Sequence, residues 1–236
     1  MELGERIYIS MEGGAIYNQH ATIGDITGKF IGNYVRGEYT TWGGAIVNDN
    51  GTIGNITGDF VGNYADMNVV SSEEHSISSP HGGAIYASSD SSIGNITGNF
   101  IGNYLNGNGA QGGAFYNNGS VGNITGDFIG NYIKENSSSY YHSMEGTRGG
   151  ALTNEYFGAI KNITGDFIGN YIDSIYSTSY GGAIYNYSKN RINNIVGDFI
   201  GNYVSSYYGE AKGGAIYNYS PIGDIVGNFI GNYVSG

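Results

Sequence analysis

The segment Ile23-Gly-Asp-Ile-Thr-Gly-Lys-Phe-Ile-Gly-Asn-Tyr-Val35 is the first of seven copies of one pattern in a chain of 236 residues. Each copy is preceded by Gly-Gly-Ala, and each contains a Phe followed at the third and fourth positions by Asn and Tyr. Successive Phe residues are 28 to 40 residues apart, so the repeat is a structural unit with connections of variable length. Such a repeat predicts one continuous array over residues 1–236 rather than separate domains. The seven Gly-Gly-Ala motifs begin at Gly13, Gly43, Gly82, Gly112, Gly149, Gly181 and Gly213.

The quoted segment has the periodicity of a β-strand. Ile26 and Phe30 are expected to face a core, and Thr27 and Lys29 to face outward. Gly28 lies between the two large apolar residues, where a missing side chain is expected to leave room for the Phe ring. Frequent Gly, β-branched and aromatic residues oppose helix. We therefore predict an all-β chain with three short strands per copy, folded as a right-handed parallel β-helix of about seven coils.

Stacking of such coils predicts columns of identical side chains. The Phe column is expected to be the main apolar ladder, and stacked carboxamides can hydrogen-bond along the axis. A second Asx column runs from Asp25 through five Asn residues to Asp224, which keeps like charges away from adjacent coils. The predicted structural ladder comprises Phe30, Phe60, Phe100, Phe128, Phe167, Phe199 and Phe229, with Asn33, Asn63, Asn103, Asn131, Asn170, Asn202 and Asn232.

Composition excludes several classes of partner. The net charge of −11 disfavours binding to nucleic acid and to anionic lipid. Without Cys the chain has no disulfide or thiolate metal site. No 18-residue apolar run exists, so we expect no direct membrane insertion of this segment. Residues 1–12 lack the features of a signal peptide, and we expect a segment of a longer protein in which residues 1–12 form an N-terminal cap or a partial coil.

Two features of the array bear on recognition. Long insertions span residues 65–81 and 134–148, both after the Tyr of a copy, where a rigid scaffold tolerates variable loops. The terminal coils would expose unpaired strand edges, so we expect end-to-end self-association or weak stability of the last coil.

The paired motif resembles the repeat of chlamydial polymorphic outer membrane proteins and related bacterial autotransporter passengers. Gly-Gly-Ala followed by an aliphatic residue alternates with Phe-x-x-Asn over nearly the whole chain. The fourth copy departs from this pattern, because Phe115 follows its Gly-Gly-Ala in place of an aliphatic residue. The resemblance implies a β-helix exposed on a bacterial cell surface or secreted, acting in adhesion. It also suits a chain without Cys, since passengers cross membranes unfolded.

Neither catalysis nor metal binding is favoured by the charged residues. Asp59, Asp127, Asp166 and Asp198 share one column, which we interpret as a solvated face rather than a carboxylate pair for glycosidic chemistry. Glu73, Glu74, His75 and His81 lie close in sequence, but their spacing matches no compact ligand pattern. We therefore predict no catalytic residue, no metal site and no cofactor.

Tyr gives the strongest functional signal. Of 23 Tyr residues, twelve belong to the repeated positions and nine of the others follow residue 139. Exposed Tyr provides large amphipathic contact area at low entropic cost. The alternative, that these rings only pack loops onto the rod, stays open. Tyr187 and Tyr219 occupy the same position in adjacent copies, so stacking of these two rings also stays open. The predicted binding residues are Tyr140, Tyr141, Tyr156, Tyr176, Tyr180, Tyr187, Tyr207, Tyr208 and Tyr219.

The preferred function is non-enzymatic display of variable loops on a stiff rod, at a bacterial cell surface or outside the cell. The expected partner is a protein or glycan of a host or of a neighbouring cell. A polysaccharide-degrading lyase or glycosidase is the first alternative, and a purely structural spacer is the second.

Overall fold

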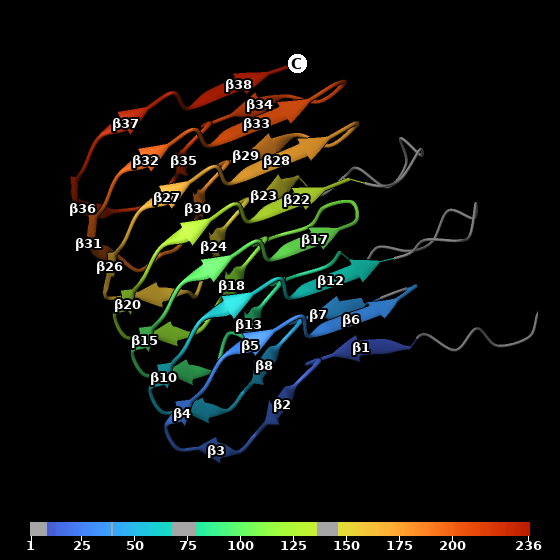
Figure 1. Ribbon diagram of the computed structural model, residues 1–236, viewed down its shortest axis with the longest axis vertical. Coiled ribbons are helices and arrows are strands. Elements are labelled where there is room, and N and C mark those ends of the chain that lie inside the picture. Colours follow the sequence, from blue (N-terminus) through green and yellow to red (C-terminus); the bar gives the residue numbers. More distant parts are fainter. Residues whose placement is uncertain (1–8, 39, 68–78, 136–145) are drawn as a thin grey trace, which may run out of the picture.

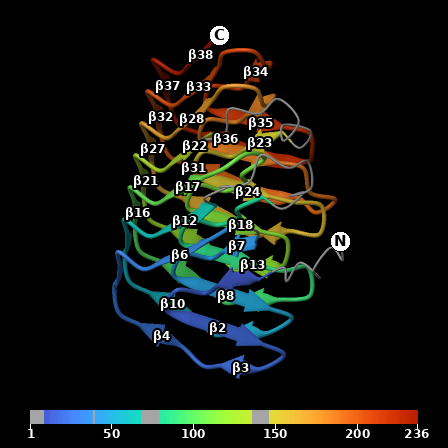
Figure 2. The same ribbon diagram turned by 90° about the vertical axis from the view of Figure 1, so that its right-hand side faces the viewer.

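The computed structural model describes residues 9–38, 40–67, 79–135 and 146–236, which form a rod of stacked β-strands without a helix (Figure 1). Equivalent strands of successive copies pair in parallel and in register. Phe60 lies between Phe30 on one side and Phe100 on the other. The rod has about six turns, close to the seven coils predicted, and the all-β solenoid is confirmed. Figure 2 shows the same coils from the side.

Four sheets contain one strand from each copy. The Ile sheet and the Phe sheet come from the two halves of the quoted segment. The Ile sheet is formed by β4 (Ile26–Thr27), β10 (Ile56–Thr57), β15 (Ile96–Thr97), β20 (Ile124–Thr125), β26 (Asn162–Thr164), β31 (Ile192–Val196) and β36 (Ile222–Val226). The Phe sheet is formed by β5 (Phe30–Ile31), β11 (Phe60–Val61), β16 (Phe100–Ile101), β21 (Phe128–Ile129), β27 (Phe167–Ile168), β32 (Phe199–Ile200) and β37 (Phe229–Ile230).

The Tyr sheet follows the Asn of each copy, and the Ala sheet follows Gly-Gly-Ala. The Tyr sheet is formed by β6 (Tyr34–Gly37), β12 (Tyr64–Met67), β17 (Tyr104–Asn106), β22 (Tyr132–Lys134), β28 (Tyr171–Ser174), β33 (Tyr203–Ser206) and β38 (Tyr233–Ser235). The Ala sheet is formed by β2 (Ile16–Gln19), β8 (Ile46–Asp49), β13 (Ile85–Ala87), β18 (Phe115–Asn117), β24 (Leu152–Asn154), β30 (Ile184–Asn186) and β35 (Ile216–Asn218).

Smaller sheets complete the coils. A five-stranded corner sheet contains β3 (Thr22–Ile23), β9 (Thr52–Ile53), β14 (Ser92–Ile93), β19 (Ser120–Val121) and β25 (Ala159–Ile160). Before Gly-Gly-Ala, β1 (Ser10–Glu12) pairs with β7 (Thr40–Trp42), and β23 (Thr147–Arg148), β29 (Ser179–Tyr180) and β34 (Ala211–Lys212) form a third small sheet. Isolated β-bridges pair Trp42 with His81, His81 with Gln111, and Gln111 with Arg148. These bridges connect the β1–β7 sheet to the sheet of β23, β29 and β34.

The predicted number of strands per copy was too low. The second copy alone contains six, β7 to β12, because Gly and Asx corners interrupt the chain every few residues. At the N-terminal end, β1 pairs in parallel with β7.

The glycines equivalent to Gly28 in the later copies have a different role from the one predicted. The structure gives Gly126 a φ of +146°, and a Cβ built there would lie 2.1 Å from the Gly98 carbonyl oxygen. The missing side chain therefore leaves room for the backbone of the adjacent coil rather than for the Phe ring.

The Phe column is the centre of the main core. Its rings stack with centroids 4.6–4.9 Å apart. The five inner Phe side chains are fully buried, whereas Phe229 in the last coil is 54% exposed. A second apolar cluster contains Val35, Ala65, Leu105 and their equivalents from the Tyr sheet. Because each coil buries its apolar groups mainly against its neighbours, the array stabilises itself by repetition.

Asn and Asp side chains form three hydrogen-bonded ladders, two of them largely buried and one on the outer surface. In the predicted one, Asn131 Oδ1 accepts from the Asn103 N–H at 3.0 Å and from Asn103 Nδ2 at 2.9 Å. The outer Asx column also hydrogen-bonds, beginning with the Asn55 N–H to Asp25 Oδ1. A further ladder, which the sequence analysis did not identify, joins Asn117, Asn154, Asn186 and Asn218 at the ends of the Ala-sheet strands.

Candidate binding surface

The residue before each Gly-Gly-Ala differs in every copy: Glu12, Trp42, His81, Gln111, Arg148, Tyr180 and Lys212. We term this the pre-glycine column. The large side chains of this column contact aromatic rings of the Ala sheet in the next coil. Trp42 stacks on Tyr86, with ring centroids 4.6 Å apart, and the centroid of Tyr180 lies 4.7 Å from that of Tyr217. A column of unlike residues, from the buried Gln111 to the exposed Lys212, gives each coil a different side chain here, so a site specific to a few coils can form on this side of the rod.

Seven aromatic side chains of the last three copies form one continuous surface, termed the aromatic face. Its rings are Tyr156, Phe157, Tyr180, Tyr185, Tyr187, Tyr217 and Tyr219, and centroids of contacting members are 4.7–6.4 Å apart. Tyr219 is 72% exposed and Tyr156 is 49% exposed, whereas Tyr185 is buried beneath its neighbours. Tyr187 and Tyr219 are in contact at 5.4 Å, but their rings are tilted by 40° and do not stack.

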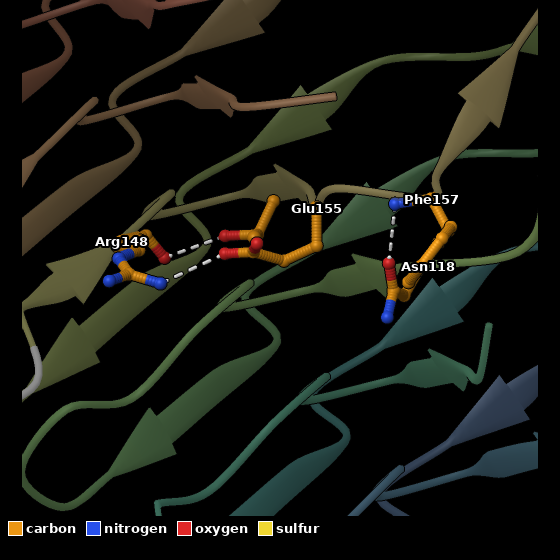
Figure 3. Close-up of polar contacts among 5 residues, drawn as sticks. Asn118, Arg148, Glu155 and Phe157 are labelled. Carbon is orange, nitrogen blue, oxygen red and sulfur yellow. Dashed lines mark hydrogen bonds and ion pairs between the residues drawn. The ribbon is translucent and has the colours of Figure 1, made fainter. Parts of the chain in front are cut away.

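Backbone hydrogen bonds between coils fix the turns that carry this face. The Tyr187 N–H donates to Asn154 O, and the Lys189 N–H donates to Tyr156 O. Figure 3 shows the edge of the face, where the Phe157 N–H donates to Asn118 Oδ1 at 2.9 Å. These bonds order exposed rings before any ligand is present, which lowers the entropic cost of binding.

Three cations border the aromatic face. Lys189 Nζ lies 4.3 Å from the centre of the Phe157 ring. The Arg148 guanidinium lies 5.3 Å from the Tyr185 ring and pairs with Glu155 at 3.0 Å (Figure 3). Lys212 lies 5.8 Å from the Tyr180 ring. Burial raises the pKa of Tyr185 to about 12, so its phenol stays protonated as a hydrogen-bond donor.

Three other predicted residues, Tyr176, Tyr207 and Tyr208, form a separate cluster. Tyr176 and Tyr208 stack at 5.2 Å, and Tyr207 meets Tyr208 edge-on, on two stacked turns after the Tyr sheet. The buried Glu135 carboxylate holds the first turn by accepting the N–H groups of Ile175 and Tyr176. Tyr140 and Tyr141 lie outside the described residues.

Among the described residues, His81 belongs to no cluster of three metal-ligating side chains. Its ring nitrogens are buried and have no hydrogen-bond partner within the described ranges, and the ring lies 4.6 Å from Tyr116 and 6.0 Å from Trp42. Burial, with a smaller contribution from Arg148, lowers its pKa to about 3. Glu73, Glu74 and His75 lie outside the described residues, and no cluster of three metal-ligating side chains occurs within the described ranges.

The carboxylate column has a structural role. Asp127 Oδ1 accepts the Asp166 N–H at 2.9 Å, and Asp166 Oδ1 accepts the Asp198 N–H at 2.8 Å. The Asn99 N–H and, secondarily, Lys29 lower the pKa of Asp59. Each carboxylate therefore caps the backbone of an adjacent coil, which explains why Asp or Asn recurs here.

Comparisons with family models, curated proteins and solved structures give no match for this chain. In the described part of the chain, no helix has the length and apolarity needed to cross a membrane.

The structure thus brings together four of the nine predicted Tyr residues, namely Tyr156, Tyr180, Tyr187 and Tyr219. Sequence reasoning missed Phe157 and the cations, and it assigned Tyr185 and Tyr217 to the repeated ladder. Two features of the sequence could have identified them: Phe157 directly follows Tyr156, and Lys189 lies two residues after Tyr187.

Proposed function

We propose that this chain is a non-enzymatic, adhesin-like β-helix of a bacterial cell surface or of a secreted protein. It would bind a glycan or protein of a host or neighbouring cell through the aromatic face. The observation that supports this most is the cluster of seven contacting rings, several of them exposed, on a backbone fixed by the coils beneath.

Energetics favour a contact role for these exposed rings over a packing role. Tyr219 touches only Tyr187 among the aromatic rings of the described chain and leaves most of its surface to solvent. Such a ring contributes little to folding, whereas burying it under a ligand removes apolar area from water at about 25 cal/mol per Å². The phenol hydroxyls and Lys189 add polar contacts at the rim, as in ordered binding sites.

A glycan array combined with a reducing-sugar assay tests this proposal. We expect retained ligand without turnover, and loss of binding in the variant Tyr187→Ser/Tyr219→Ser with an unchanged unfolding midpoint. Tyr34→Ser is the control, because Tyr34 in the first copy is exposed (55%) and contacts one aromatic ring, as Tyr219 does. Turnover of a glycan would support the enzyme alternative, and equal binding by all variants would refute the aromatic face as the site.

A further inference from the structure

The geometry points to a cationic groove next to the aromatic face that binds the carboxylate of an acidic oligosaccharide. The inference rests on the proposed binding function of the aromatic face and names the chemical class of its ligand. The groove has a volume of about 440 Å³, within the usual range of small-ligand sites. Lys161, Arg191, Asn193, Ser120 and Asn95 contribute to its lining.

The groove lies where the repeat changes. In the first four copies, Gly and Asx form a corner in which the Asx oxygen accepts the next Asx N–H, as from Asn123 to Asn95 Oδ1 at 2.9 Å. In the fifth and sixth copies Lys161 and Asn193 replace this Gly, whereas the seventh copy has Gly223. The corners of the sixth and seventh copies lie within the continuous strands β31 and β36. The groove spans this change, because its lining contains Gly94 and Gly122 of the first type together with Lys161 and Asn193.

Lys161 and Arg191 lie on one side of this hollow. The Asn193 N–H donates to Lys161 O at 2.9 Å, and Arg191, which directly precedes β31, is exposed like Asn193 two residues later. Strand spacing and rise then place Lys161 and Arg191 roughly 8 Å apart at the backbone. A Cβ on Gly223 would lie 2.8 Å from Arg191 Nη2, so the Gly leaves space for the guanidinium.

The charge of these side chains is not neutralised by the protein. Lys29, Arg36, Arg148 and Lys212 each pair with a carboxylate. Among the described residues, no carboxylate pairs with Lys161 or Arg191, although the chain carries a net charge of −11. Two unpaired cations in one groove of an acidic protein favour an anionic ligand, and Arg binds a carboxylate through two parallel hydrogen bonds.

The donor set favours an acidic sugar over a free phosphate. Phosphate sites commonly use free backbone N–H groups, but here the Gly122 N–H donates to Ile93 O and Gly94 O. What remains are cations, the Ser120 hydroxyl and carboxamides, which suit a carboxylate flanked by sugar hydroxyls. Phe157 and Lys161 are four residues apart, so sugar rings beyond the carboxylate would lie toward the aromatic face.

Calorimetric titration with tetragalacturonate and with its neutral methyl ester tests the inference. We expect the wild-type protein to bind the acid at least tenfold more tightly, and Lys161→Gln or Arg191→Gln to reduce its affinity to that of the ester. Lys29→Gln, an exposed cation on another side of the coil, is the matched control and should change nothing. Since Lys161 and Arg191 are exposed and unpaired, their variants should also keep the wild-type unfolding midpoint.

Each other outcome separates the two proposals. Equal binding of acid and ester that Tyr187→Ser/Tyr219→Ser abolishes would overturn the groove and leave the aromatic face supported. Binding of neither oligosaccharide would also overturn the groove, while the array experiment decides the aromatic face. Inorganic phosphate that competes as well as tetragalacturonate at equal concentration would show a general anion site and overturn the assignment to an acidic sugar.

Discussion

Replacement of Asn131 by Ala tests the buried Asn ladder as the element that ties coil to coil. Asn131 Oδ1 accepts from the Asn103 N–H, and Asn131 Nδ2 donates to Phe100 O at 2.8 Å and to Asn170 Oδ1 at 3.0 Å. The residue is fully buried, so water cannot replace these contacts. Ala would leave the Asn103 N–H and the Phe100 carbonyl without these partners.

The expected magnitude follows from the number of groups that lose a partner. A buried unsatisfied polar group costs about 1–3 kcal/mol, so two cost about 2–6 kcal/mol. A whole domain is stable by only about 5–15 kcal/mol. Asn131→Ala should therefore lower the urea midpoint strongly. Asn131→Asp keeps an acceptor and removes the donor, and it should destabilise more at pH 7 than at pH 4, where protonation restores a donor.

Asn33→Ala is the matched control at the end of the ladder. Its Nδ2 donates to Asn63 Oδ1, which also accepts the Asn33 N–H, so the substitution leaves no buried group unpaired. We expect a loss of about 1 kcal/mol or less. Urea unfolding followed by circular dichroism measures both variants. Equal losses in the two would refute the ladder reasoning.

Three further outcomes are expected. Gly126→Ala should prevent stable folding, because its Cβ would lie 2.1 Å from Gly98 O. Gly130 has a φ of +59°, and a Cβ there meets no atom within 4 Å, so Gly130→Ala should lower the free energy of unfolding in urea by only about 1–2 kcal/mol. The pKa of His81 is lowered to about 3 in the folded protein, so the unfolded chain takes up this proton first as the pH falls below about 6.5. The free energy of unfolding should therefore decrease between pH 6.5 and pH 3, and it should decrease less in His81→Gln. Burial and neighbouring Tyr residues raise the pKa of Tyr104 to about 12, so stability should fall as pH rises from about 10 to 12, with phenolate absorbance delayed relative to the unfolded chain.

The fold was predictable because identical residues recur at identical offsets. A Phe or Asn column has one simple explanation in a parallel stack, and the observed register places Phe60 between Phe30 and Phe100. The role of Gly126 was not predictable in the same way. Its neighbour across the stack is the backbone of another coil, and that contact depends on a corner conformation that the alternation of side chains does not reveal.

Only part of the candidate site could be predicted for a related reason. The excess of late Tyr identified Tyr187 and Tyr219, since they are irregular residues at one offset. Grouping them with Tyr180 rather than with Tyr208 required the coil path, because both lie on segments outside the repeated block. Tyr185 occupies a repeated position and becomes part of a site only because its neighbours differ from those of earlier copies.

Three departures from the repeat coincide in the fifth to seventh copies. The pre-glycine column presents Tyr180, the turn after the Ala sheet gains Tyr187 and Lys189, and the corner Gly is replaced at Lys161. Each departure alone is compatible with relaxed constraint on a solvated surface. Their coincidence in the same three copies favours a common cause. Placement of unpaired cations next to fixed aromatic rings gives all three one explanation, a ligand that spans the corner from the Ala sheet to the Ile sheet.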